Sequence, residues 1–249
     1  MNKIIKKRLD QILVLKKLVD SKSKAQSMIM AGQVTVNDKV ITKSGNSFAL
    51  DSKIVINKLH PDWVSRGALK LLKAVDTFKI DISNKICLDI GSSTGGFSEV
   101  LLLNKAKKIF AVDVGTNQLH EKLRKEKKII SIENFNAKYL NYTIISEKID
   151  LLVCDVSFIS LKKVIFPNLK LLSSKAEIIA LIKPQFETQK KNLRKGVVKD
   201  ALIRNNVCED IENWFTNICK AEVIGTTPSP IMGPKGNLEF LIYCRLNIS

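Results

Sequence analysis

The chain has 249 residues, of which 45% are hydrophobic, and its formal net charge is +17. Its apolar runs are far too short to span a bilayer, no signal peptide with a small-residue cleavage site is readable, and its five cysteines form no C-x-x-C pair. These features disfavour a membrane protein, a disulfide scaffold and a cysteine zinc site, and they predict a cytoplasmic protein. With two histidines in the chain, we expect no metal.

The excess positive charge is concentrated at the amino terminus. Residues 1–58 contain 12 Lys or Arg and 4 Asp, with no Glu, which gives a net charge of +8. Nearly half of the excess therefore lies in under a quarter of the chain. Such a basic module indicates an anionic partner such as nucleic acid, whereas compositional drift would spread the charge evenly.

The amino-terminal segment reads as two helices followed by short strands. Apolar residues at helical spacing predict the inner face of the first helix: Leu9, Ile12, Leu13 and Leu18. Ser21 or Ser23 can cap a second helix that stops at Gly32. A hairpin over 34–41 and a further strand at 53–56 follow.

The same segment resembles the S4-like RNA-binding domain. The resemblance rests on R-L-D-x-x-L from Arg8, on Lys24-Ala25, and on the pattern from Ile29 to Asn37. It implies a small α+β RNA-binding domain over 1–59 in which Arg8, Lys22 and Lys24 contact RNA. Family members usually carry an arginine beside the second-helix serine, and the lysines found here keep the charge but lose the bidentate fork. A generic basic domain is the alternative.

Residues 60–66 are the predicted linker, and a second domain is expected over 67–249. A helix follows from Arg66 to Phe78, with these residues facing inward: Leu69, Leu72, Val75 and Phe78. Lys70 lies in this otherwise apolar helix, where an ordinary solvated lysine would be the simpler interpretation.

The centre of the second domain is a strand, a glycine turn and a helix. Residues 86–90 are an apolar run, and helical spacing resumes from Gly96. The turn reads G-x-x-x-G-G, which differs from the G-x-G-x-x-G of pyrophosphate sites, and Asp89 would repel a pyrophosphate. A cationic or zwitterionic nucleoside such as S-adenosylmethionine (SAM) fits better, with a nucleotide site or an empty fold as alternatives.

A second carboxylate supports a nucleoside site. Asp113 ends the next strand, 24 positions after Asp89, where a carboxylate reaches ribose hydroxyls. We expect Asn136 near the adenine. The residues predicted around the rest of the SAM molecule are Asp89, Gly91, Ser92, Ser93, Thr94, Gly95, Gly96, Phe97 and Asp155.

Further strands alternate with helices along the second domain. Strands are predicted at 128–133, 149–155 and 176–182, a helix at about 200–219, and two last strands at 221–226 and 238–245. This alternation predicts an α/β fold with a mostly parallel sheet and an antiparallel end.

Four polar residues stand at or near element ends in the order Lys-Asp-Lys-Glu: Lys70, Asp155, Lys183 and Glu239. Each alone has an ordinary structural interpretation. Together they resemble the catalytic tetrad of the FtsJ-type ribose 2′-O-methyltransferases.

The resemblance extends over nearly the whole chain to the TlyA (haemolysin A-like) rRNA methyltransferase family. Its signatures are residues 65–71, 89–97, 111–115, 155–160, 181–187 and 236–240. It implies a Rossmann-like SAM-dependent methyltransferase fold with a seven-stranded sheet. It also implies methylation of a ribose 2′-hydroxyl, of a cytidine in small-subunit or also large-subunit rRNA, and an RNA contact from Arg66. The chain departs from the family at Gly67-Ala68 and at 194–198, where family members carry more glycine.

We expect Lys183 to lie nearest the hydroxyl, as base or as stabiliser of the alkoxide, with Asp155 and Glu239 orienting the lysines and Lys70 keeping Lys183 partly neutral. No metal is required, and a monomer is assumed. The alternatives are an idle RNA-binding or ribosome-assembly module, a methyltransferase of proteins or small molecules, and a haemolysin-like membrane-active protein, which the chain disfavours.

Overall fold

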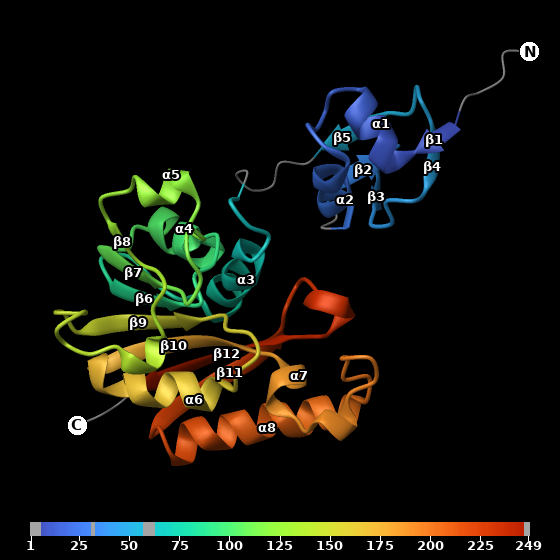
Figure 1. The fold of residues 1–249 in the computed structure, drawn as a ribbon. Helices are drawn as coiled ribbons and strands as arrows, with labels where there is room; N and C mark the ends of the chain where they lie inside the picture. Colours follow the sequence, from blue (N-terminus) through green and yellow to red (C-terminus); the bar gives the residue numbers. More distant parts are fainter. Residues whose placement is uncertain (1–5, 31–32, 57–62, 247–249) are drawn as a thin grey trace, which may run out of the picture. The chain divides into compact units, whose positions relative to one another are not determined.

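The computed structural model describes residues 6–30, 33–56 and 63–246 (Figure 1). The chain divides into two compact units between residues 62 and 63. Residues 63–66 of the predicted linker belong to the second unit, because Trp63 and Val64 pack against its core. The first residues of that linker, 60–62, lie outside the described residues.

The amino-terminal unit combines two helices with short antiparallel strands. Its elements are β1 (Lys6–Arg8), α1 (Leu9–Leu15), α2 (Lys22–Met30), β2 (Val34–Val36), β3 (Lys39–Ile41), β4 (Ser47–Ala49) and β5 (Ile54–Ile56). They form a sheet of order β3-β2-β5 and a pair β1-β4. The pair was not predicted, because β1 consists of three exposed cations and shows no apolar alternation.

Apolar residues from both helices and β2 form the core of this unit. Leu9, Ile12 and Leu13 are fully buried, as predicted, but Leu18 is 42% exposed because α1 ends at Leu15. Ser21 caps α2, since its Oγ accepts a hydrogen bond from the backbone N of Lys24. The predicted helix stop at Gly32 lies outside the described residues.

The second unit is built on one seven-stranded sheet of order β11-β12-β10-β9-β6-β7-β8. The strands are β6 (Ile86–Ile90), β7 (Lys108–Val112), β8 (Ile129–Ile132), β9 (Ile149–Cys154), β10 (Leu172–Ile182), β11 (Ala221–Pro228) and β12 (Phe240–Leu246). Strands β6 to β10 pair in parallel, and β12 runs antiparallel to both of its neighbours. The predicted mostly parallel sheet with an antiparallel end is therefore confirmed.

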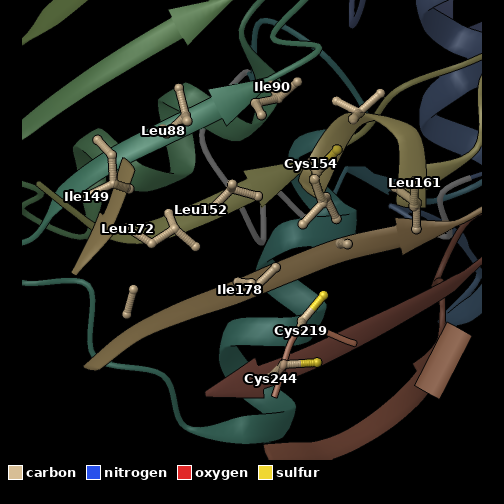
Figure 2. Close-up of a cluster of buried hydrophobic side chains, with 14 of the residues drawn as sticks. Leu88, Ile90, Ile149, Leu152, Cys154, Leu161, Leu172, Ile178, Cys219 and Cys244 are labelled. Carbon is tan, nitrogen blue, oxygen red and sulfur yellow. The ribbon is translucent and has the colours of Figure 1, made fainter. Parts of the chain in front are cut away.

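Helices cover both faces of this sheet (Figure 1). The α-helices are α3 (Ala68–Phe78), α4 (Gly96–Leu103), α5 (Glu121–Arg124), α6 (Leu161–Ile165), α7 (Pro184–Glu187) and α8 (Ala201–Asn217). Short 3-10 turns are η1 (Ala137–Tyr139), η2 (Phe166–Leu171), η3 (Lys190–Asn192) and η4 (Pro234–Gly236). Alternate strand residues pack against α3, α4 and α5 on one face and against α6 and α8 on the other. Figure 2 shows part of the core on the face of the sheet covered by α6 and α8, including Leu88, Leu152 and Ile178 from neighbouring strands.

Two elements differ in extent from the prediction. Strand β10 begins at Leu172, four residues before the predicted start. The prediction missed these residues because 173–175 are polar, and the register of β10 against β9 is irregular there. Helix α3 begins at Ala68. Among the described residues, no helix is long and apolar enough to cross a membrane.

Gly91 ends β6 and lets two loops meet at the carboxyl edge of the sheet. Its φ is +81°, and a Cβ there would lie 2.7 Å from the carbonyl oxygen of Asp155, after β9. The turn after β6 and the turn after β9 therefore touch. This contact brings Asp155 beside the glycine turn.

Candidate active site

Two adjoining cavities open at the carboxyl ends of β6, β7 and β9. The first has a volume of about 220 Å³ and is lined by the start of α3, the glycine turn, Asp155, Ser157 and Lys183. The second, of about 440 Å³, is lined mainly by apolar side chains together with Asp113 and Asn136. Gly91, Ser93, Asp155 and Ser157 line both cavities.

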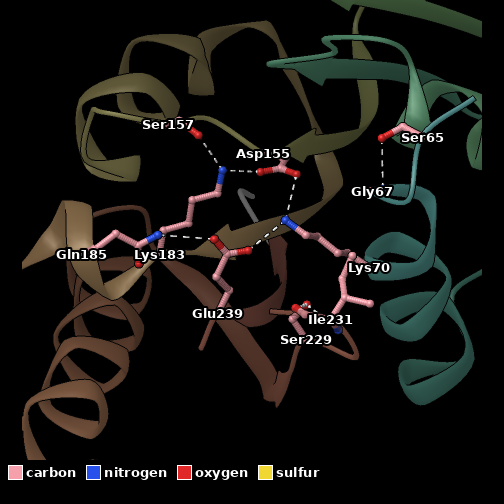
Figure 3. A network of polar contacts seen from close by, with 10 residues as sticks. All are labelled: Ser65, Gly67, Lys70, Asp155, Ser157, Lys183, Gln185, Ser229, Ile231 and Glu239. Carbon is pink, nitrogen blue, oxygen red and sulfur yellow. Dashed lines mark hydrogen bonds and ion pairs between the residues drawn. The ribbon is translucent and has the colours of Figure 1, made fainter. Parts of the chain in front are cut away.

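The four residues of the predicted tetrad meet in one polar network beside the first cavity (Figure 3). Lys70 projects from the first turn of α3 and is 8% exposed; its Nζ lies 2.8 Å from Glu239 Oε2. Glu239 is 1% exposed, and its Oε1 accepts a hydrogen bond of 3.4 Å from Gln185 Nε2. Since the partners are buried, losing either charge would leave the other without compensation.

Lys183 completes the network from the end of β10. Its Nζ lies 2.6 Å from Asp155 Oδ1 and donates a hydrogen bond of 2.8 Å to Ser157 Oγ. The second oxygen of Asp155, Oδ2, lies 3.5 Å from Lys70 Nζ. Two ammonium groups and two carboxylates thus alternate, which balances the charge and fixes the direction of each amine.

Gly233 leaves the space that Glu239 occupies. A Cβ on this glycine would stand 2.0 Å from Glu239 Oε1. Its backbone N also donates to the carbonyl oxygen of Asn237, which closes the turn before β12. The turn therefore directs Glu239 toward Lys70.

The glycine turn forms one wall of the first cavity. Of the residues predicted there, these line it: Gly91, Ser92, Ser93, Thr94, Gly96 and Phe97. Gly95 and Asp89 line neither cavity. Gly95 precedes α4 with a φ of +99°. It packs so closely against Leu119 and Leu123 that a Cβ would clash with both side chains.

Asp89 lies beneath the glycine turn and is fully buried. Its Oδ2 accepts a hydrogen bond of 2.6 Å from Ser98 Oγ, while its Oδ1 has no donor among the described residues. Burial raises the pKa of Asp89 to about 7, and the Ser98 hydrogen bond opposes this shift. Asp89 was expected to repel a pyrophosphate and to contact SAM; in the structure it is fully buried and lines neither cavity.

The second cavity has the features that a nucleoside requires. Asp113 stands at its rim with Oδ2 accepting from Ser93 N at 2.8 Å and Oδ1 accepting from Gly115 N at 2.7 Å. Asn136 lines the cavity and caps η1, because its Oδ1 accepts from the backbone N of Lys138. A fixed carboxylate beside an apolar cavity suits a ribose joined to a flat base.

The residues predicted to contact RNA have mixed surroundings. Arg8 holds Asp10 through two hydrogen bonds of 3.1 and 2.9 Å, and this contact lowers the pKa of Asp10 to about 2. Lys24 Nζ lies 3.6 Å from Asp20 Oδ2, and Lys22 is exposed. Arg66, in the second unit, is exposed and lines the first cavity. Arg8 therefore has a structural contact besides any contact with RNA.

Two partners of the tetrad were not predicted as site residues. Ser157 and Gln185 bind Lys183 and Glu239, respectively. Both lie in stretches that carry the family resemblance, two residues after a tetrad member, so their proximity in sequence was the available signal. Among the described residues, no group of three His, Cys, Asp or Glu side chains could hold a metal ion.

Comparisons with known proteins agree with this geometry. The sequence matches the FtsJ-like methyltransferase family over residues 63–246 and the S4 domain family over residues 7–46. It is 41% identical over 241 residues to Hemolysin A of Brachyspira hyodysenteriae, covering 95% of this chain and 98% of that one. It is 36% identical over 240 residues to the 16S/23S rRNA (cytidine-2'-O)-methyltransferase TlyA of Mycobacterium tuberculosis, covering 96% and 89%.

A solved structure agrees as well. It comes from a Streptococcus thermophilus protein provisionally named a hemolysin, which is 34% identical in sequence and superimposes with a TM-score of 0.75. The match covers 99% of this chain and 90% of that chain. The likeness therefore extends across both units.

Proposed function

The chain belongs to the TlyA family, with an S4 domain before an FtsJ-like methyltransferase domain, and on that premise we propose that it methylates a ribose 2′-hydroxyl of ribosomal RNA. The methyl donor is SAM, and the acceptor is a cytidine of the small or the large subunit, as the name of the Mycobacterium tuberculosis relative suggests. Such a substrate would place the protein in the cytoplasm.

One observation carries this proposal. Lys183 Nζ lies at the first cavity, held by Asp155 Oδ1 at 2.6 Å and by Ser157 Oγ at 2.8 Å. A fixed amine at this place can hydrogen-bond a ribose hydroxyl that enters the cavity. A hydrogen bond aligned before reaction removes much of the cost of orienting the nucleophile.

The cavities fit the donor. The second cavity offers apolar walls for the adenine and Asp113 for the ribose, and the first offers the backbone of the glycine turn for the methionine part. When bound, SAM supplies a methyl group that its sulfonium has already activated. The protein need only position the hydroxyl and manage its proton.

The roles of the four residues follow from their contacts. As a neutral amine, Lys183 takes up the hydroxyl proton; as an ammonium group, it stabilises the developing alkoxide. Asp155 directs it toward the cavity. Lys70 holds the second Asp155 oxygen and is itself held by Glu239. Glu239 therefore holds Lys70, Lys70 holds the carboxylate of Asp155, and this carboxylate holds Lys183.

The test is methyl transfer from labelled SAM to purified small and large ribosomal subunits, followed by nucleoside analysis. The wild type should place label in a 2′-O-methylated nucleoside, and Lys183→Ala should not. Lys73→Ala is the matched control, because Lys73 is an exposed lysine of α3 outside both cavities. Absence of label from both subunits, despite SAM binding, would contradict the proposal and favour an RNA-binding module without activity.

A further inference from the structure

A group of cations lies on the methyltransferase unit, in segments other than those that hold the predicted RNA contacts. We call it the basic turn and define it by five cations from η3 to the start of α8 and one from η4: Lys190, Lys191, Arg194, Lys195, Lys199 and Lys235. A cavity of about 350 Å³ opens in it, lined by Lys191, Asn192, Arg194, Lys199, Asp200 and Ile203.

The cations of this cavity lack anionic partners. Among the described residues, the side chains of Lys191, Arg194 and Lys199 make no hydrogen bond or ion pair with another side chain. Asp200 is the one acid in the lining, and its Oδ1 accepts from the backbone N of Leu202 as the cap of α8. The cavity therefore presents a net positive charge to solvent.

Lys235 adds charge from a separate segment of the chain. Its Nζ lies 3.3 Å from the position that a Cβ of Gly196 would take. The ammonium group thus rests over the turn formed by the bridge between Arg194 and Val197. Two segments of the chain therefore contribute cations to the basic turn.

The basic turn is fixed relative to the tetrad. Asn237 is 3% exposed; its Oδ1 accepts from Val198 N at 3.1 Å and its Nδ2 donates to the carbonyl oxygen of Gly196 at 3.0 Å. Two residues later stands Glu239. At its other end, the turn connects through η3 and α7 to Lys183. An anion bound at the turn would therefore stand at a set position relative to both residues.

We propose that the basic turn binds backbone phosphates of the RNA strand that carries the methylated ribose, and so positions this ribose at Lys183. The inference rests on the proposed function and adds a contact site to it. Spaced cations with an arginine among them suit a row of phosphates, because each phosphate accepts bidentate or point-charge contacts. An isolated phosphate would need fewer of them.

The test compares two triple variants of equal charge. Lys191→Gln/Arg194→Gln/Lys199→Gln removes the cations that line the cavity. The matched control, Lys107→Gln/Lys127→Gln/Lys175→Gln, removes three exposed lysines from the amino ends of β7, β8 and β10, at the opposite edge of the sheet. The SAM affinity of both triple variants is measured by calorimetry and should equal that of the wild type. This result would show that each variant folds.

Binding to small ribosomal subunits and to polyuridylate is measured between 50 and 200 mM salt. Three lost phosphate contacts should lower the slope of log K against log salt by about 2 to 3 in the basic-turn variant and leave the control near wild type. The kcat/KM of the basic-turn variant for subunits should fall relative to the control. Binding does not require methyl transfer, so these slopes test the basic turn even if the subunits are not methylated.

Equal slopes for the two triple variants would overturn the proposal. If, with equal slopes, inorganic phosphate at ionic strength matched with chloride bound to the wild type and not to the basic-turn variant, the turn would be assigned to a free phosphate and not to an RNA backbone.

Discussion

The carboxylate of Asp155 lies 2.6 Å from the Nζ of Lys183, and its other oxygen faces the Nζ of Lys70 at 3.5 Å. One side chain at the end of β9 thereby joins a lysine from the end of β10 to a lysine from the first turn of α3. A change at Asp155 should consequently affect both amines at once.

Asp155→Asn should lower the rate of methyl transfer about 10²- to 10⁴-fold, because an amide cannot hold two ammonium groups and Lys183 would lose its direction. Ser157→Ala removes only a neutral acceptor from Lys183 and should cost far less. The measurement is the single-turnover rate on ribosomal subunits with saturating SAM. Since Asp155 lines both cavities, SAM affinity is measured separately. Equal losses for the two variants would contradict the bridging role of Asp155.

Asp89 should make the stability of the second unit depend on pH. Its folded pKa of about 7 lies above its ordinary value of 3.8, because burial disfavours the charged form. The folded state then holds a proton that the unfolded state has lost, so stability is complete below about pH 4 and falls as pH rises to about 7. The fall amounts to about 4 kcal/mol.

Asp89→Asn should remove this fall, since an amide does not titrate. Ser98→Ala should extend it to higher pH, because the Ser98 hydrogen bond lowers the pKa of Asp89. Unfolding by denaturant is followed by tryptophan fluorescence, which reports on the second unit because Trp63 and Trp214 both belong to it. Parallel curves for wild type and Asp89→Asn between pH 4 and 7 would show that Asp89 does not titrate there.

Much of the second unit could be predicted because its strands are short apolar runs between helices of clear period. Strand β9 is an example: an apolar run from Leu151 to Cys154 marks it, and burial on both faces explains that run. The start of β10 was missed because Ser173 to Lys175 are polar where the strand leaves the sheet's interior. The order of the four tetrad residues and the family resemblance predicted that these residues act together. Neither predicted which lysine forms an ion pair with which carboxylate. Lys70 and Glu239 are 169 positions apart, and only the folded sheet sets them at 2.8 Å.

The burial of Asp89 shows a second limit of the sequence. An acid at the end of a strand beside glycines reads as a ligand-facing group, and the pattern does not reveal which way the side chain turns. In the structure, Ser98 in the first turn of α4 holds the Asp89 carboxyl by donating a hydrogen bond from its Oγ to Asp89 Oδ2. The contact depends on how α4 packs on β6, which is a property of the whole sheet.

Glu99 should couple the start of the second unit to SAM binding. It is 1% exposed and accepts hydrogen bonds from the backbone N of Val64 at 2.7 Å and from Lys122 Nζ at 2.8 Å. Glu99→Ala would leave a partly buried N–H without a partner, which costs about 1–3 kcal/mol. It would also loosen residues 65–67, which line the first cavity, and so weaken SAM binding.

Glu99→Gln is the matched control, because a side-chain carbonyl can still accept from Val64. Lys122→Gln tests the other contact, and little change is expected since Lys122 is 57% exposed. Calorimetric titration with SAM should rank affinity as wild type, then Glu99→Gln, then Glu99→Ala. If Glu99→Ala bound SAM as tightly as the wild type, the hydrogen bond between Glu99 and Val64 would have no effect on the first cavity.

Gly233 and Gly236 offer a test of how closely the tetrad must be held. Gly233→Ala would place a methyl group 2.0 Å from Glu239 Oε1, so the carboxylate must move and release Lys70. A displacement of about 1 Å can cost about 10²-fold in rate, and we expect a loss of that order in methyl transfer. Gly236→Ala adds a methyl group to open space but at a φ of +84°, so it should cost about 1 kcal/mol of stability and leave the rate unchanged.

The two variants separate displacement of Glu239 from strain in the turn that carries it. Rates are measured with saturating SAM and subunits, and free energies of unfolding from denaturant titration. If Gly236→Ala lost as much activity as Gly233→Ala, strain in the turn would be sufficient and contact with Glu239 would not matter. If neither lost activity, the position of Glu239 would not limit methyl transfer. Glu239→Gln distinguishes these cases, because it keeps the shape of the side chain while removing the charge that Lys70 faces.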